Sequence, residues 1–134
     1  MSEVDLALST FRSALSRLEE GIRFTRDDET EENLLKRDGV IQRFEFTFEL
    51  LWKTLKIVLE SKGILCKAPS ECLKEAFRLG LIQDETAYMQ MLKDRNKTSL
   101  LYSKGQADDI FDNIKTIHLN KMQELLAALI KNPQ

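Results

Sequence analysis

The sequence predicts an all-α protein, an up-and-down bundle of four to five helices. Its 134 residues are enough for one hydrophobic core, so we expect a single domain over residues 1–134. Only 5 Gly and 2 Pro are present, and residues 1–68 contain no proline, whereas small β-sandwiches and barrels need many Gly and Pro turns. Apolar residues recur at spacings of three and four along most of the chain, which is the period of an amphipathic helix. Long helices joined by short connections are typical of a helical bundle.

Residues 4–24 are predicted to form the first helix. One stripe of this segment is apolar and the intervening residues are polar or charged, as in a helix that packs on a core with one side. The stripe consists of Val4, Leu8, Phe11, Leu15, Leu18 and Ile22. The acidic stretch 27–32 then forms a connection and can supply the acidic first turn of the next helix.

The second helix is expected to be the longest and to end at Gly63, because no helix breaker lies between Val40 and Lys62. Its first apolar stripe consists of Ile41, Phe44, Phe48, Leu51, Leu55 and Val58. A second stripe consists of Phe46, Leu50 and Trp52. A helix that is apolar on two faces is one that other helices surround, so we expect this helix at the centre of the bundle.

Five residues of the same segment also fit a strand. Phe44, Phe46 and Phe48 alternate with Glu45 and Thr47, which is the period-two pattern of a half-buried strand. The three-and-four spacing persists for about eighteen residues, a length that favours a helix over a strand.

The rest of the chain predicts three more helices. A short helix begins at Pro69 and ends at Gly80, Asp84 caps a fourth that ends near Asn96, and a last helix covers residues 107–131. The apolar stripe of the last helix includes Ile114, His118, Met122, Leu125 and Leu129.

Charge and hydropathy give no sign of a membrane protein. The formal net charge is −2, so no overall basic excess points to nucleic acid or to a membrane surface. No stretch approaches the roughly 18 apolar residues of a membrane-spanning helix. The acidic amino terminus does not resemble a secretory signal, so we expect a cytoplasmic protein.

The sequence contains few cysteine and histidine side chains. Cys66 and Cys72 are the only cysteines and His118 is the only histidine, whereas a structural zinc site needs about four such ligands, so no metal is predicted. As two ordinary thiols, the cysteines fit a reducing cytoplasm. A Ser/His/Asp or Cys/His site would need His118, whose apolar stripe favours a core histidine. The glycines are scattered singly, so neither a glycine-rich phosphate loop nor a cofactor is predicted.

The segment before the last helix carries the functional signal. It reads Asp94-Arg95-Asn96-Lys97-Thr98-Ser99-Leu100-Leu101-Tyr102. This resembles the HEPN superfamily, specifically the nucleotidyltransferase substrate-binding branch that includes the HepT toxins. Members carry Arg-Asn, then usually Thr-Ser, then a His two residues before a Tyr. Residues 43–53 resemble the long helix of that branch and residues 69–82 its third helix, so the resemblance covers nearly the whole chain.

The resemblance implies a helical-bundle homodimer whose Arg and His loops meet across the interface to form a metal-independent ribonuclease site. It also implies a partner, a minimal nucleotidyltransferase that silences such toxins by transferring AMP to the motif tyrosine. Carried over to this chain, Arg95 is the phosphate-facing cation, Asn96 its polar neighbour and Tyr102 the AMP acceptor. We expect Lys93 and Lys97 to add positive charge that attracts RNA phosphates, although such charges are also common on a merely solvated helix face.

One position departs from the family motif, because Leu100 stands where the histidine belongs. Cleavage of RNA without a metal needs a group that moves protons, and histidine suits this role because its pKa lies near neutrality. Leucine cannot transfer a proton. Loss of general acid–base help costs on the order of 10² to 10⁴ in rate, so we expect an impaired ribonuclease.

Three hypotheses about function follow. In the first, the protein binds a nucleotidyltransferase and presents Tyr102, with weak or no ribonuclease activity. In the second, it is an active ribonuclease toxin of a toxin–antitoxin pair, with another proton carrier in place of the histidine, and AMP transfer to Tyr102 neutralises it. In the third, it is a structural dimer whose site has degenerated, so that Arg95 and Asn96 are ordinary helix-end residues and Tyr102 is a packed aromatic at a helix junction.

Overall fold

The computed structural model describes residues 2–100 and 103–131, and over these residues the regular structure is entirely helical, as predicted. The elements are α1 (Glu3–Arg23), α2 (Glu31–Ser61), α3 (Pro69–Arg78), α4 (Glu85–Lys97), a 3₁₀ turn (Thr98–Leu100), α5 (Lys104–Asn113), a π turn (Ile114–His118) and α6 (Leu119–Lys131). Within the described residues, no helix is both long and apolar enough to cross a bilayer.

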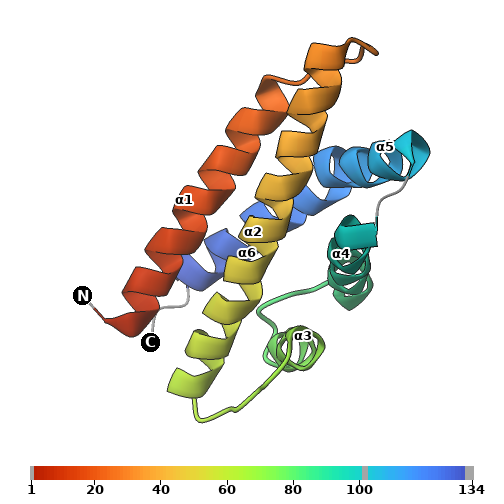
Figure 1. Cartoon of the computed structure of the whole chain (residues 1–134). Helices are drawn as coiled ribbons and strands as arrows, with labels where there is room; N and C mark the ends of the chain where they lie inside the picture. The colour runs from red at the N-terminus through yellow and green to blue at the C-terminus, as the bar shows by residue number, and fades with distance from the viewer. Residues whose placement is uncertain (1, 101–102, 132–134) are drawn as a thin grey trace.

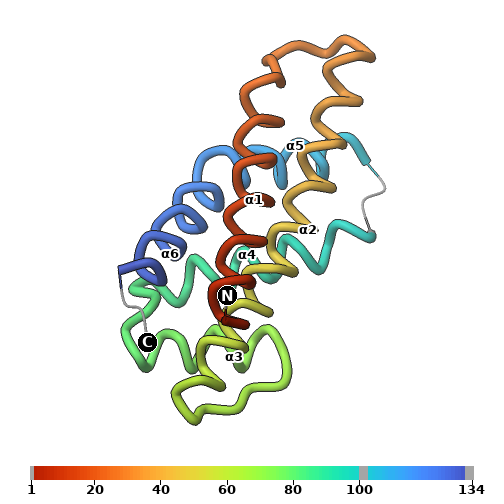
Figure 2. Tube along the Cα trace, turned by 90° about the vertical axis from the view of Figure 1, so that its left-hand side faces the viewer, coloured from red at the N-terminus to blue at the C-terminus, as the bar shows by residue number. Residues whose placement is uncertain are grey.

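Helix α2 lies at the centre of the bundle, as predicted. It runs antiparallel to α1, while α5 and α6 cross behind this pair and α3 and α4 lie on one side (Figures 1 and 2). Accordingly α2 packs against α1, α3, α4 and α5, and α1 also packs against α6. Four of the other helices thus pack directly on α2, and α6 is connected to it through α1.

The helix ends follow the predicted capping residues. Gly63 and Gly80 have φ values of +82° and +78°, the left-handed conformation that a glycine adopts without steric cost. After each of them the next amide bonds back to the helix, Ile64 N to Leu59 O and Leu81 N to Ala76 O, both at 2.9 Å. This is the Schellman motif that ends many helices. Asp84 accepts a hydrogen bond from the Ala87 amide at 3.1 Å and so caps α4, as expected.

The first stripe of α2 forms the core, whereas the second stripe is only partly buried. Phe44, Phe48 and Leu51 are fully buried. Phe46, however, is 60% exposed, so its assignment to a second buried face is wrong. The physical reason is that Phe46 lies on a part of α2 that the other helices leave exposed, whereas Leu50 and Trp52 are partly buried and pack against the core.

The last predicted helix begins slightly earlier than expected and is not uniform. It begins at Lys104, where Ser103 and Gln106 form a capping box, and it continues to Lys131 through the π turn. The predicted stripe from Ile114 to Leu129 is buried, His118 included.

The two cysteines are bonded to each other, so their interpretation as two ordinary thiols is wrong. Cys66 lies in the loop before α3 and Cys72 in the first turn of that helix, and the two Cα atoms are 5.2 Å apart, within the range of a disulfide. The chain reverses direction at this loop and brings the two residues together, which their spacing alone did not reveal. Free thiols were one argument for a location in the reducing cytoplasm, and the disulfide removes that argument.

Reduction of this disulfide is expected to lower the free energy of unfolding by roughly 2 kcal/mol, because the crosslink closes only a short loop in the unfolded chain. Urea denaturation with and without dithiothreitol measures the effect. The double variant Cys66→Ser/Cys72→Ser serves as the control, since reductant should leave it unchanged. Identical curves for the wild-type protein in both conditions would show that the bond does not stabilise the fold.

Candidate functional site

Arg95 lies near the end of α4 and is held against α2. Its guanidinium forms an ion pair with Glu49 of α2 and lies 5.7 Å from the centroid of the Phe48 ring. It also donates a hydrogen bond to the side-chain oxygen of Asn96 at 3.1 Å. The Arg95 side chain remains 29% exposed, so one side of the guanidinium still faces solvent. Contacts with Glu49, Phe48 and Asn96 thus fix the cation that the motif predicts as phosphate-binding.

Glu49 is the counter-charge of this site, and spacing along the chain did not predict it. Burial raises the pKa of the Glu49 carboxyl, but the neighbouring Trp52 side chain and the cations Arg95 and Lys53 lower it by more. The carboxylate is therefore ionised near neutral pH. A phosphate that binds Arg95 has to compete with this carboxylate for the same N–H groups.

The other predicted cations lie elsewhere on α4. Lys93 and Lys97 are exposed and, being four residues apart, share one face of the helix. Arg95 lies between them in sequence and on a different face, against α2. The structure thus separates the predicted phosphate-binding residues into a fixed arginine and two solvent-facing lysines.

The positions that follow Arg95 in the motif are described only in part. Leu100 ends the 3₁₀ turn that begins at Thr98, and the Thr98 hydroxyl donates to the carbonyl of Arg95 at 2.7 Å. Tyr102, the predicted AMP acceptor, lies outside the described residues. The chain is described again from Ser103, which caps α5.

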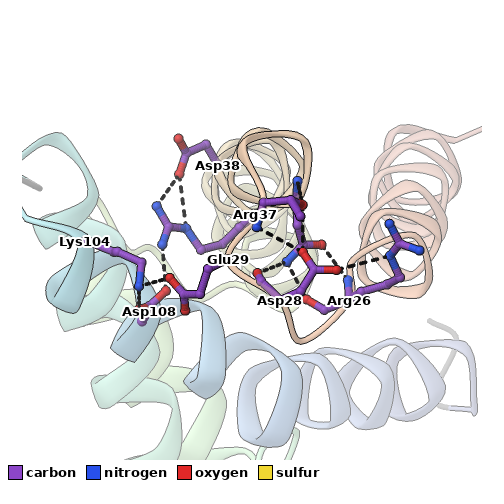
Figure 3. Close-up of polar contacts among 9 residues, drawn as sticks. Arg26, Asp28, Glu29, Arg37, Asp38, Lys104 and Asp108 are labelled. Atoms are coloured by element: carbon purple, nitrogen blue, oxygen red, sulfur yellow. Dashed lines mark hydrogen bonds and ion pairs between the residues drawn. The ribbon is translucent and has the colours of Figure 1, made fainter.

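A cluster of charged side chains ties the beginning of α5 to α2. Arg37 of α2 is buried and donates to Asp108 of α5 at 2.6 Å and to Asp38 at 3.0 Å, while Lys104 pairs with Glu29 and Asp108 (Figure 3). The motif segment therefore runs between two anchored helix ends, α4 on one side and α5 on the other.

A pocket of about 460 Å³ lies beside the motif segment, between α2 and the beginning of α5. Its polar lining consists of Arg37, Asp38, Glu45, Thr98, Ser103 and Lys104. Because this lining carries charges of both signs, it does not select strongly for an anion.

His118 is fully buried, which confirms the prediction of a core histidine, but it also has a polar partner that the sequence did not reveal. Its Nε2 atom lies 2.7 Å from a carboxylate oxygen of Asp94, the residue directly before Arg95. Asn113 and Gln90 each donate to the same carboxylate at 3.0 Å. The His118 ring stacks on Phe44 of α2, with 5.3 Å between centroids. The buried pair of Asp94 and His118 is therefore adjacent to the motif arginine along the chain.

Asp94 is expected to make stability depend on pH. Burial raises the pKa of this carboxyl, but hydrogen bonds from His118, Asn113 and Gln90 lower it below its ordinary value of 3.8. The stabilisation by Asp94 is therefore complete above that value and is lost as the pH falls toward the lowered folded-state pKa. At pH 7, Asp94→Asn should cost about 2 kcal/mol, the usual effect of losing hydrogen bonds to a charged group.

Urea denaturation at several pH values between neutrality and pH 3 tests this expectation. The difference in unfolding free energy between the wild-type protein and Asp94→Asn should narrow as the pH falls. Asp109→Asn, at an exposed position of α5, is the control for removal of a surface carboxylate and should change the unfolding free energy little. A difference for Asp94→Asn that stays constant over this range would contradict an ionised Asp94 in the native state.

Comparison with known proteins identifies the family. Residues 6–131 match the family described as "Nucleotidyltransferase substrate binding protein like". Among curated proteins, "Probable ribonuclease HepT" of Haemophilus influenzae is 33% identical over 81 residues, which is 57% of this chain and 56% of that protein. The match thus spans little more than half the length of that relative.

Two solved structures share the fold along almost their whole length. One, from Thermus thermophilus, has a TM-score of 0.77 and 31% identity, covering 87% of this chain and 96% of the other. The second, from Haemophilus influenzae, is described as the fold of a substrate binding domain of a nucleotidyltransferase. It has a TM-score of 0.81 and 26% identity, covering 90% of this chain and 97% of the other. With the motif blocks that predicted it, these matches show that the chain belongs to the HepT-like branch of the HEPN superfamily, the nucleotidyltransferase substrate binding protein-like family.

Proposed function

We propose that this protein is the HEPN-type partner of a minimal nucleotidyltransferase and that its own ribonuclease site is impaired. The observation that carries the proposal is the position of the only histidine in the sequence. His118 is 0% exposed and bonded to Asp94, while Leu100 occupies the place of the motif histidine.

The burial of His118 bears on the chemistry directly. A general base has to come within hydrogen-bond reach of the proton that it removes, here that of a ribose 2′-OH. The His118 ring is enclosed by the core and its Nε2 atom is already bonded to Asp94, so RNA cannot reach it. The hydroxyls of Thr98 and Ser99 are poor bases at neutral pH. The site therefore keeps the motif arginine but has no histidine that could transfer protons to and from RNA.

Partner binding remains a function for such a site. The structural relative from Haemophilus influenzae is described as a nucleotidyltransferase substrate binding domain, and the match to that family covers nearly all of this chain. Arg95 keeps the planar guanidinium that binds phosphate through two parallel hydrogen bonds. An AMP group on Tyr102 would place an anion in the same motif as Arg95 and Lys97, where opposite charge favours it. A homodimer would present two such motifs to the partner.

The test looks for a gene of a minimal nucleotidyltransferase beside the gene of this protein and combines the two purified proteins. We expect a stable complex by size-exclusion chromatography and, with ATP, a mass increase of one AMP on Tyr102. In that transfer the tyrosine oxygen bonds to the α-phosphorus of ATP and pyrophosphate leaves. Tyr102→Phe, which removes only the hydroxyl, should still bind the partner but should not gain mass. Absence of both a complex and a modification would contradict the proposal.

A second candidate is an active ribonuclease toxin. The observation in its favour is that Arg95 and Asn96, which precede the missing histidine in the motif, contact each other at the end of α4. This hypothesis requires growth arrest on expression and loss of that arrest in Arg95→Ala. Normal growth with soluble wild-type protein counts against it.

A further inference from the structure

The helix that carries His118 contains one π turn, and this turn brings two side chains onto one carboxylate. In the turn Ile114–His118 the amide of Leu119 donates to the carbonyl of Ile114, five residues earlier. In a regular α-helix, residues five apart, such as Asn113 and His118, point in clearly different directions. Here both side chains donate to the same oxygen of Asp94. Single π turns inside α-helices are frequent at functional sites.

His118 is poorly suited to a packing role alone. Asp94 is a hydrogen-bond acceptor, so the Nε2 atom of His118 donates to it. The other ring nitrogen, Nδ1, is buried and has no hydrogen-bond partner among the described residues. A buried polar atom without a partner destabilises a fold, and an apolar side chain of similar size would avoid this cost. The imidazole therefore contributes to the fold through its hydrogen bond to Asp94.

The same surface of α2 supports both His118 and Arg95. Phe44 stacks on the His118 ring, and Phe48, one helical turn later, lies below the Arg95 guanidinium. Asp94 connects the two contacts, because it is bonded to His118 and is joined covalently to Arg95. These contacts therefore hold the end of α4, which carries the motif arginine, against α2.

We infer that His118 is a positioning residue, which acts through Asp94 to hold the end of α4 so that Arg95 stays over Phe48 and paired with Glu49. The inference rests on the proposed function only in taking Arg95 as the phosphate-binding group. It gives the buried histidine a role in the site without contact between His118 and any substrate.

The test compares His118→Leu with His118→Gln by NMR of ¹⁵N-labelled protein. Glutamine can replace the Nε2 donor and leucine cannot. The readout is the Nε–Hε signal of Arg95, assigned by its loss in Arg95→Lys, and its response to Glu49→Gln. In the wild-type protein and in His118→Gln, we expect a distinct signal that Glu49→Gln shifts. In His118→Leu, the signal should move toward that of an exposed arginine and Glu49→Gln should no longer shift it.

A second destabilised variant shows whether a loss of stability alone changes the Arg95 signal. Leu125→Ala removes buried surface from α6 and should lower stability without changing the Arg95 signal. If His118→Leu does not fold, Asp94→Asn takes its place, because it keeps the side-chain size and removes the charged acceptor. An Arg95 signal that is unchanged in His118→Leu, or in Asp94→Asn as its replacement, overturns the inference.

Binding of a short RNA oligonucleotide distinguishes failure of the inference from failure of the proposed function. We expect His118→Leu to bind about tenfold more weakly than the wild-type protein, the size of one lost charge-assisted contact, and His118→Gln to bind almost normally. If no variant binds RNA but the Arg95 signal still depends on His118, the positioning role stands and Arg95 as the RNA phosphate ligand is excluded.

Discussion

Replacing Phe48 with alanine is expected to lower the free energy of unfolding by about 3–5 kcal/mol, the range for removal of a buried aromatic ring. Phe48 has 0% exposure and lies in the middle of α2, where it packs on Phe44 with 6.5 Å between ring centroids. The cost includes both the lost burial and the cavity that surrounding helices fill only partly. Urea denaturation followed by circular dichroism measures it.

The matched control is Phe46→Ala, two residues away on the same helix. Phe46 is 60% exposed, so this variant should change the unfolding free energy by only about 0.5 kcal/mol. A strand over these residues would place Phe44, Phe46 and Phe48 on one face and would make the two alanine variants similar. Equal losses for Phe46→Ala and Phe48→Ala would therefore contradict the orientation of α2.

The helices were predictable because the information that defines them is local. The three-and-four spacing of apolar residues marks each buried stripe, and Gly63, Gly80 and Asp84 mark helix ends by their own backbone and side-chain chemistry. None of these inferences requires knowledge of a distant residue. The same reasoning failed for Phe46, because periodicity shows that a face is apolar and does not show whether another helix covers it.

The site was predictable only as a set of motif residues. Arg95 was identified from a local pattern, but its partner Glu49 lies 46 residues earlier and is brought near only by the packing of α4 on α2. The bond between Asp94 and His118 depends in addition on a π turn, which shifts the direction of all later side chains and has no signal in the spacing of apolar residues. Both contacts are tertiary, which is why spacing along the chain could not reveal them.

Restoring the motif histidine is expected to have the largest effect on activity. Leu100→His should raise cleavage of total RNA, measured without metal and in the presence of EDTA, by about 10²- to 10⁴-fold over the wild-type protein. The new imidazole would supply the proton transfer that leucine cannot, four positions beyond Asn96 in the motif. Ser99→His, with the same side chain one position earlier, is the matched control and should remain inactive.

The gain should also depend on Arg95, since in the proposed site the arginine binds the phosphate on which the new histidine acts. Arg95→Ala in the Leu100→His background should therefore return cleavage to the wild-type level. Cleavage by the wild-type protein that is lost in Arg95→Ala would instead assign the ribonuclease to the unmodified chain and would require a proton carrier other than histidine. Histidine is excluded as this carrier because His118 is enclosed in the core and Leu100 cannot transfer a proton. That result would favour the hypothesis of an active ribonuclease toxin. Silence of both the wild-type protein and Leu100→His would mean that more than one residue separates this site from an active ribonuclease.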